Sequence, residues 1–320
     1  MQNVLSVIQA STLYFQKNGV ESPRLNIEHL LAHVLGKKRM ELYLEFDRPL
    51  GDAELEPLRA LVRRRAGGEP LQHLLGTAEF HGRIFTCDKR ALIPRPETEQ
   101  FCEIVLARGP AARVLDVGTG SGVIALTLAA AWPEARVEAV DVSADALALA
   151  RENAARLGLT ERVLFAQSDL LESVTGEFDL IVANLPYIAT AEIAQLAREV
   201  RHDPLPALDG GPRGLEIFER FIPQAARHLR GRLALEIGHD QAAPLTALPP
   251  EIAAFPVELA EGGLRLIYRG GNGEGGGRAD VAQLAQALTR AGIGYISLDI
   301  HDSSLEDIFV GLLGQQEVPA

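Results

Sequence analysis

The sequence of 320 residues is short of cysteine, of basic residues and of long apolar runs, and each shortage excludes a class of protein. Its two cysteines, Cys87 and Cys102, are too few for a disulfide framework and do not have a metal-ligand spacing. Lys and Arg number 31 against 43 Asp and Glu, and the resulting net charge of −12 argues against a general electrostatic grip on nucleic acid. With no apolar run of about eighteen residues and no leader pattern at the start, the sequence predicts a cytoplasmic protein without a membrane segment.

The first 76 residues carry helical periodicity and no motif for chemistry. Apolar residues recur at helical spacing ahead of Gly36, at Ile27, Leu30, Leu31, Val34 and Leu35. The same segment holds a local exception to the acidic charge, Arg63-Arg64-Arg65, which we interpret as the solvated end of a helix rather than a phosphate contact. We therefore expect residues 1–76 to form a small helical domain that supports or selects a partner.

Residues 77–93 change character and predict a short β-hairpin linker, because apolar residues alternate there with polar ones around a glycine. Pro94 and Pro96 then fix the backbone, and Glu97 or Thr98 is expected to open the next helix.

Predicted strands and helices alternate from residue 112 to residue 269. The strands are expected at 113–117, 136–140, 163–166, 178–183, 232–237 and 264–268, with helices at 123–131 and 144–157. Such alternation is typical of parallel βαβ units in a doubly wound sheet. Ligands of these sheets bind beyond the carboxyl ends of the strands, which is where the motifs for chemistry fall.

A glycine-rich segment, Gly118-Thr119-Gly120-Ser121-Gly122, joins the first strand to the first helix. Glycines let the backbone approach a ligand because no Cβ intervenes, and a helix N-terminus favours a negative group such as a carboxylate. Dinucleotide-binding folds use a similar loop, but their fingerprint is Gly-x-Gly-x-x-Gly, whereas the spacing here is Gly-x-Gly-x-Gly.

Acidic residues lie at the ends of three successive strands: Asp116, Asp141 and Asp169. A carboxylate at Asp141 can accept both hydroxyls of a ribose. Asp169 is placed to accept the exocyclic amine of adenine. Loop and acids together predict a site for S-adenosylmethionine, with a nicotinamide or flavin dinucleotide as the alternative.

The tetrapeptide Asn184-Leu185-Pro186-Tyr187 follows the fourth strand, so it is expected at the same edge of the sheet. The side-chain carbonyl of Asn184 can accept one N–H of a planar NH2 group, and the main-chain carbonyl of Leu185 can accept the other. Pro186 stiffens this turn, and Tyr187 can cover the face of the group. An amide nitrogen is a poor nucleophile, so holding both hydrogens with the lone pair toward a methyl donor favours in-line displacement. Alone, the tetrapeptide would be an ordinary turn; beside the glycine-rich loop it predicts methyl transfer to nitrogen.

Further segments carry a resemblance to a known family: Pro23-Arg24, 31–36, 68–76, 92–99, 116–122, 184–187, 209–216 and 235–238 with Gln241. Over roughly residues 5–269 the chain resembles the bacterial release factor glutamine N5-methyltransferases. Segment 92–99, which reads Leu-Ile-Pro-Arg-Pro-Glu-Thr-Glu, discriminates most, since the related ribosomal-protein glutamine methyltransferases share the amide-holding tetrapeptide but differ there.

The resemblance implies a seven-stranded class I S-adenosylmethionine-dependent methyltransferase domain at 94–269, with residues 1–76 docking the protein substrate. That substrate would be a class I peptide chain release factor, methylated on the glutamine of its Gly-Gly-Gln motif. The roles implied for individual residues are as follows: cofactor binding by Gly118, Thr119, Gly120, Ser121, Gly122, Asp141, Asp169, Leu170 and Asn184; catalysis and glutamine binding by Asn184, Leu185, Pro186 and Tyr187; and lining of the acceptor side by Pro94, Arg95, Pro96 and Glu97. No metal, nucleic acid or membrane is implied.

Two parts of the chain depart from the family. Leu185 stands where the commonest form of the motif has proline, and because the position contributes a main-chain carbonyl, leucine should serve with a slightly looser turn. Residues 270–278 form a glycine-rich linker, and residues 279–320 are an acidic appendage predicted to lie outside the sheet. The segment 304–314 resembles the C-terminal end of some ABC-transporter ATPases, but the chain has no Gly-x-x-x-x-Gly-Lys-Ser/Thr loop.

Three alternatives remain open from the sequence. The acceptor could be another protein glutamine, such as one on a ribosomal protein, or the amine of DNA adenine, which the same kind of tetrapeptide can hold. The third is a non-catalytic module that binds the cofactor and recruits a partner.

Overall fold

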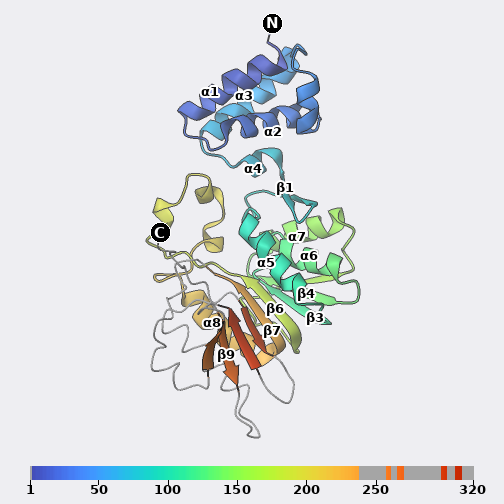
Figure 1. Cartoon of the computed structure of the whole chain (residues 1–320), viewed down its shortest axis with the longest axis vertical. Helices are drawn as coiled ribbons and strands as arrows, with labels where there is room; N and C mark the ends of the chain where they lie inside the picture. The colour runs from blue at the N-terminus through green and yellow to red at the C-terminus, as the bar shows by residue number, and fades with distance from the viewer. Residues whose placement is uncertain (1, 238–256, 261–264, 270–296, 301–306, 312–320) are drawn as a thin grey trace. The chain divides into compact units, whose positions relative to one another are not determined.

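The structure is a computed structural model that describes residues 2–237, 257–260, 265–269, 297–300 and 307–311 (Figure 1). The chain divides into two compact units. The first unit comprises Met1–Ala78, Thr86–Lys89 and Gln195–Asp203, so it is helical and takes in more of the chain than residues 1–76. The second comprises Glu79–Phe85, Arg90–Ala194 and the residues from Pro204 onward.

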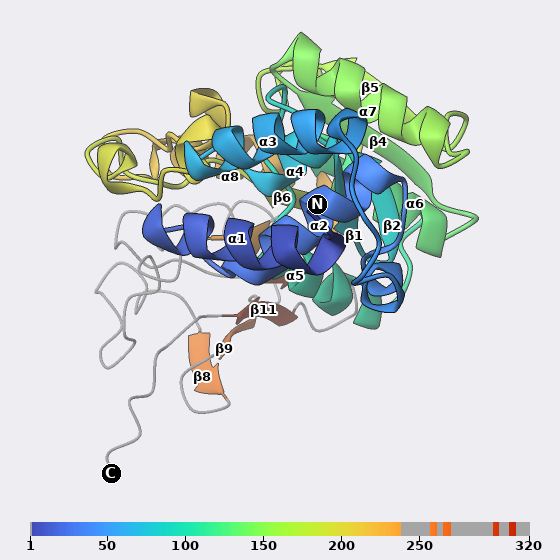
Figure 2. The ribbon, with the colours of Figure 1, turned by 90° about the horizontal axis from the view of Figure 1, so that it is seen from above.

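The helical unit is built from α1 (Val4–Lys17), α2 (Pro23–Leu35), the 3-10 helix η1 (Arg39–Leu44), α3 (Asp52–Ala66) and the short α4 (Leu71–Leu75). Helix α1 begins at a capping box, in which the Ser6 amide donates to Oδ1 of Asn3 at 2.9 Å. Helix α2 ends at Gly36, whose φ of 63° is left-handed. Figures 1 and 2 show α1, α2 and α3 side by side, and their apolar faces form one core that includes Ile27.

The arginine run at the end of α3 is not a solvated helix end throughout, so that interpretation is wrong for Arg65. Arg65 is 3% exposed and donates to Oδ1 of Asn26 at 2.6 Å and to Oε1 of Glu199 at 2.5 Å. Its neighbour Arg64 forms an exposed ion pair with Glu69. A guanidinium suits the buried position of Arg65 because its planar group can donate to several acceptors at once.

The predicted hairpin linker is confirmed as a two-stranded sheet of β1 (Thr77–Phe80) and β2 (Arg83–Thr86). Phe80 and Phe85 meet edge to face, with ring centroids 6.0 Å apart. Helix α5 (Pro96–Ala107) begins at Pro96, with Arg95 as its N-cap, slightly earlier than the predicted start at Glu97 or Thr98. Proline is favoured in the first helical position because its missing N–H would have no partner there.

The second unit contains the predicted alternation of strands and helices. The elements are β3 (Arg113–Val117), α6 (Val123–Ala131), β4 (Arg136–Asp141), α7 (Ala144–Arg156), β5 (Val163–Gln167), β6 (Phe178–Asn184), α8 (Glu216–His228) and β7 (Leu229–Glu236). Their strands are parallel, in the order β5-β4-β3-β6-β7. The chain thus winds outward from β3 to β5 and returns to β6 on the other side of β3, which is the doubly wound pattern.

The described sheet has nine strands, where the resemblance implied seven. Beyond β7 lie β10 (Ser297–Ile300), β11 (Asp307–Gly311), β9 (Arg265–Arg269) and β8 (Val257–Ala260), each antiparallel to its neighbour. The prediction that the acidic appendage stays outside the sheet is therefore wrong for β10 and β11. An edge strand presents unpaired N–H and C=O groups, and an alternating apolar segment such as 295–300 can pair with them. The predicted glycine-rich linker at 270–278 lies outside the described residues.

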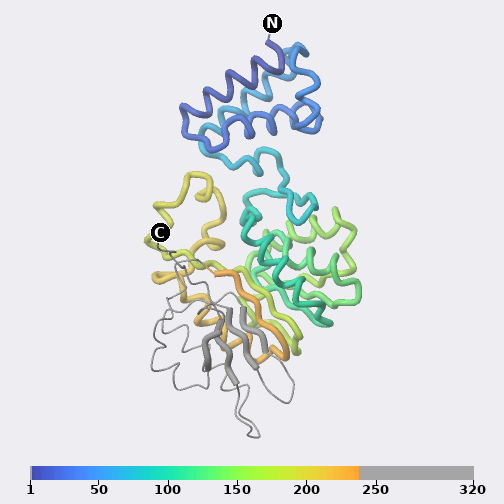
Figure 3. Tube along the Cα trace, in the orientation of Figure 1, coloured from blue at the N-terminus to red at the C-terminus, as the bar shows by residue number. Residues whose placement is uncertain are grey.

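A long loop joins β6 to α8 and contains three short 3-10 turns, η2 (Ile193–Gln195), η3 (Val200–His202) and η4 (Leu205–Ala207). Figure 3 traces it as it leaves β6 and returns to α8. Two main-chain hydrogen bonds close its base: the Ile188 amide donates to the Leu208 carbonyl at 3.1 Å, and the Gly210 amide donates to the Ile188 carbonyl at 2.9 Å. The stretch just after Tyr187 is thereby tied down independently of the loop.

Among the helices of the described residues, none combines the length and the apolarity that crossing a membrane would require.

Candidate functional site

The candidate site lies where the winding of the sheet reverses, between β3 and β6. The glycine-rich loop follows the carboxyl end of β3, and Asn184 ends β6, its neighbour in the sheet. A pocket at this edge contains about 1150 Å³ of empty space, open solvent included, and residues from both segments line it. The switch point of a doubly wound sheet is the place where ligands bind.

The glycine-rich loop can exist only with glycines in three places. Gly118, Gly120 and Gly122 have φ values of 74°, 56° and 83°, a region that other residues rarely adopt. Main-chain hydrogen bonds from Gly118 and Thr119 to the Val140 carbonyl, at 2.9 and 3.0 Å, anchor the loop to β4. Two hydrogen bonds thus hold the start of the loop against β4.

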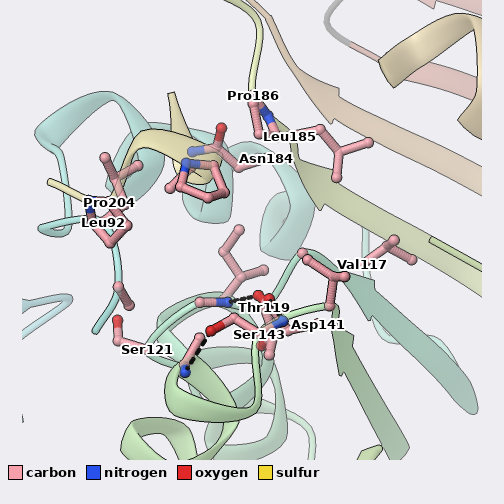
Figure 4. Close-up of a pocket in the computed structure, with 18 of the residues that line it drawn as sticks. Leu92, Val117, Thr119, Ser121, Asp141, Ser143, Asn184, Leu185, Pro186 and Pro204 are labelled. Atoms are coloured by element: carbon pink, nitrogen blue, oxygen red, sulfur yellow. Dashed lines mark hydrogen bonds between the residues drawn. The ribbon is translucent and has the colours of Figure 1, made fainter. Parts of the chain in front are cut away.

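Asp141 braces this loop from the end of β4. One carboxylate oxygen accepts from the Gly120 amide and the other from the Ser143 amide, each at 2.8 Å (Figure 4). Burial nevertheless dominates and raises the pKa of Asp141 above its ordinary value. Each oxygen retains a second lone pair, so the carboxylate keeps two acceptors for a ligand, and its binding of the two hydroxyls of a ribose stays a prediction.

Asp116 lies beneath the loop and is fully buried. Its Oδ2 accepts from the Thr119 hydroxyl at 2.7 Å and from the Ala125 amide at 3.1 Å, while Oδ1 has no hydrogen-bond partner among the described residues. Burial raises the pKa of Asp116 to about 7. Asp116 is not among the residues that line the pocket, so it supports the loop from beneath rather than contacting a ligand.

Asp169 and Leu170 line the same pocket after β5. Oδ2 of Asp169 accepts from Arg220 at 2.6 Å, which leaves Oδ1 for a ligand amine. Leu170 is buried and has a φ of 50°, a left-handed conformation that is uncommon outside glycine and asparagine. Both residues thus lie in the pocket, and the contact with adenine that the resemblance implies for them stays a prediction.

The acceptor tetrapeptide faces the glycine-rich loop across the pocket (Figure 4). The Asn184 side-chain amide donates to Oγ1 of Thr98 at 3.1 Å. The Leu185 side chain is 3% exposed and lies so close to Gly118 that a Cβ on that glycine would be 2.9 Å from its Cδ2. Leu185 therefore contributes more than a main-chain carbonyl, because its side chain fills the space between the two functional segments.

Gly210, the first glycine of the pair after Asp209, lies against the main chain of the acceptor turn. A Cβ on Gly210 would lie 2.8 Å from both the Pro186 carbonyl oxygen and Cα of Tyr187. The main chain of the acceptor turn thus passes directly over Gly210, and no side chain fits between them. Burial raises the pKa of the neighbouring Tyr187 hydroxyl.

Most, but not all, of the predicted site residues line the pocket. Those that do are Pro94, Arg95, Gly118, Thr119, Gly120, Ser121, Asp141, Asp169, Leu170, Asn184, Leu185 and Pro186. Gly122, Pro96, Glu97 and Tyr187 are outside that lining. A Cβ on Gly122 would lie 3.2 Å from Cβ of Ala150, so this glycine allows the loop to pack on α7.

Sequence reasoning missed three contributions to the site. Thr98 was considered only as a helix start, yet it contacts Asn184. Glu236 ends β7 directly opposite Asn184 in the sheet register. Pro204, Pro206 and Ala207 line the pocket from η4. Thr98 and Glu236 fall within the segments 92–99 and 235–238 that carry the family resemblance, and the two prolines stiffen their segment of the chain, but none of these signals indicated contact with the acceptor site.

Comparisons with known proteins agree with this geometry. The PrmC N-terminal domain family matches residues 6–76, and the methyltransferase small domain family matches residues 98–203. A release factor glutamine methyltransferase of Chlorobaculum tepidum is 44% identical over 262 residues, covering 77% of this chain and 89% of that protein. The chain belongs to the release factor glutamine methyltransferase family.

Two further release factor glutamine methyltransferases show the same extent of similarity. That of Geobacter sulfurreducens is 47% identical, covering 72% of this chain and 82% of its own. The one from Deinococcus radiodurans is 44% identical, and the match covers 75% of this chain and 88% of that protein. The family's methyltransferase activity requires S-adenosylmethionine, and the pocket fits that cofactor: Asp141 offers two acceptors, and Asp116 lies buried beneath a loop that brings main chain to the pocket wall.

Proposed function

We propose that this protein transfers the methyl group of S-adenosylmethionine to the side-chain amide nitrogen of the glutamine in the Gly-Gly-Gln motif of class I release factors. The observation that carries the proposal is the placement of Asn184 and the glycine-rich loop on neighbouring strands, around one pocket. We place the reaction in the cytoplasm, where release factors act on ribosomes.

The cofactor supplies an electrophilic methyl group on a positively charged sulfur. In the proposal, Asp141 holds the ribose hydroxyls, and the turn at Asp169 and Leu170 flanks the adenine. The glycines of the loop 118–122 let the main chain approach the rest of the cofactor. These groups are fixed by the main-chain hydrogen bonds of the loop and of Asp141, so they need little rearrangement on binding.

The acceptor amide is a weak nucleophile because its nitrogen lone pair is delocalised. Asn184 would accept one of its N–H groups through Oδ1, and the Leu185 carbonyl would accept the other. With both hydrogens held, the lone pair is directed at the methyl group, and such positioning can supply several kcal/mol. The N–C bond would form as the methyl–sulfur bond breaks, S-adenosylhomocysteine would leave, and one N–H proton, which becomes acidic as the bond forms, would pass to solvent. Pro94 and Arg95 line the same pocket and would exclude water from the acceptor side.

The test is mass spectrometry of a purified class I release factor incubated with this protein and S-adenosylmethionine. We expect a gain of one methyl group on the glutamine of the Gly-Gly-Gln motif, and none on a release factor in which that glutamine is replaced by alanine. Asn184→Ala should lower the rate at least about a hundredfold while cofactor binding by calorimetry persists. The matched control is Glu134→Gln, an exposed residue in the turn before β4.

Label that appeared instead on a ribosomal protein or on DNA adenine would overturn the substrate assignment. Of these, adenine has the weaker support, because the net charge of −12 opposes binding to a polyanion.

A further inference from the structure

Glu236 is a half-buried residue beside the acceptor site whose carboxylate the proposed chemistry does not use. It ends β7, and the sheet register places it opposite Asn184 at the end of β6. Its Oε2 is buried without a hydrogen-bond partner among the described residues. Burying a carboxylate oxygen costs free energy unless hydrogen-bond donors face the group.

The side chains of Thr98 and Asn184 are the donors whose interaction with Glu236 lowers its pKa. Thr98 lies on α5, is 3% exposed, and accepts a hydrogen bond from Nδ2 of Asn184 at 3.1 Å. Because its oxygen accepts from Asn184, its own hydroxyl hydrogen is available for Glu236. Hydrogen bonds from Thr98 and from Asn184 both favour the ionised form of Glu236 and oppose the effect of its burial.

This arrangement determines which way the amide of Asn184 points. The two ends of an asparagine amide have nearly the same shape, so packing alone does not distinguish them. An ionised carboxylate only accepts hydrogen bonds, and it repels an amide oxygen while attracting an amide NH2. With Glu236 and Thr98 taking the NH2 group, Oδ1 of Asn184 must turn the other way.

We propose that Glu236 is a positioning residue for methyl transfer, acting with Thr98 to hold the Asn184 amide with its oxygen turned toward the acceptor glutamine. The proposal rests on the proposed function, since it concerns how that acceptor is held. A reversed Asn184 would present its NH2 group to the substrate NH2 group, and neither could accept from the other.

The protonation of Glu236 provides a readout for this role. Burial raises the pKa of Glu236 to about 6, and the carboxylate of Glu97 on α5 adds to the rise. The other titratable groups that interact with it are the Tyr187 hydroxyl and the Cys102 thiol, whose own pKa values are both raised. Below pH 6 Glu236 becomes a donor as well as an acceptor, and it no longer discriminates between the two ends of Asn184. Activity should therefore decline as the pH falls through about 6.

The first experiment compares kcat, KM for the release factor and cofactor affinity across pH 5 to 8 for the full-length protein, Glu236→Gln and Thr98→Val. We expect kcat to fall about tenfold to a hundredfold in both variants, as one charge-assisted hydrogen bond is worth, with cofactor affinity unchanged. Glu236→Gln should also lose the decline near pH 6. Thr98→Ser, which keeps the hydroxyl, should restore kcat, and Glu134→Gln serves as the exposed control.

Wild-type kcat in Thr98→Val, or an unchanged decline near pH 6 in Glu236→Gln, would overturn the proposal. A second measurement avoids dependence on catalysis and on the folding of the variants. The side-chain NH2 signals of Asn184 are followed by 15N NMR in the wild-type protein from pH 5 to 8, after assignment with Asn184→Asp. Signals that titrate near pH 6 support the contact, and signals that do not move refute it.

The two hypotheses fail in different ways. If the wild-type protein does not methylate a release factor but the Asn184 signals titrate, the substrate assignment is lost and the contact stands. If the wild-type protein methylates the release factor and the variants match it, the substrate assignment stands and the positioning role is lost.

Discussion

Replacing Gly118 with alanine tests whether the cofactor loop and the acceptor turn form one packed body. Gly118 has a φ of 74°, and a Cβ there would lie 2.9 Å from Cδ2 of Leu185, which is 3% exposed, so the leucine side chain must shift to admit the added methyl group. The substitution therefore combines two penalties: a left-handed conformation for alanine and a collision with Leu185.

The two penalties can be separated with variants that the chain itself offers. The left-handed conformation costs about 1–2 kcal/mol, and forcing an extra methyl into a filled space costs about 1–3 kcal/mol. Gly158 has a φ of 70°, and a Cβ added there would meet nothing within 4 Å, so Gly158→Ala should show the first penalty alone. In the double variant Gly118→Ala with Leu185→Ala, the collision is removed while the conformational penalty remains.

The assay is chemical unfolding of the four members of this cycle, with S-adenosylmethionine affinity measured by calorimetry on each. We expect the double variant to be more stable than the sum of the single effects by about 1–3 kcal/mol, the size of the collision. Effects that add to within about 0.5 kcal/mol would refute the claim that Leu185 links the two segments, because independent sites behave in that way.

Three further outcomes follow from the structure. Asp141→Ala should weaken S-adenosylmethionine binding about a hundredfold, since two charge-assisted hydrogen bonds are lost, whereas the exposed Asp145→Ala should leave calorimetric affinity unchanged. Gly210→Ala should lower kcat at least about tenfold without changing cofactor affinity, because the main chain of the acceptor turn is displaced; Gly51→Ala, where a Cβ meets nothing within 4 Å, is the control. For Asp116, burial raises the folded-state pKa to about 7, so its contribution to stability is present below pH 4 and lost as the pH rises through 7; Asp116→Asn should flatten that part of the pH–stability curve in unfolding experiments.

Local patterns predicted much of the second unit, because its strands and helices have strong periodicity and short connections. The range of β3 and that of α6 were predicted as observed, and β4, β5 and β6 were each predicted to within one residue. The glycine-rich loop was also predictable, since glycine supplies a conformation that other residues rarely adopt. Strand β8 was not predicted, being only four residues long.

Contacts between distant parts of the chain were not predictable from local pattern. The burial of Arg65 depends on Glu199, which lies 134 residues further along. The proximity of Thr98 to Asn184 spans 86 residues, and that of Glu236 to Asn184 follows only from the sheet register. Periodicity assigns a residue to the face of an element, but it does not say which face of another element lies opposite.

The hydrogen bonds at the base of the loop between β6 and α8 hold its two ends together, outside the intervening residues 191–207. Ile188 is joined to Leu208 and Gly210 on the far side of those residues, so the position of Tyr187 is fixed by a short bridge rather than by the loop's own course. Loops closed in this way tolerate changes in length and composition at small thermodynamic cost. Sequence change within 191–207 therefore leaves the main chain at Tyr187 in place, and its limits are set by Glu199, which pairs with the buried Arg65, and by Pro204, Pro206 and Ala207, which line the pocket.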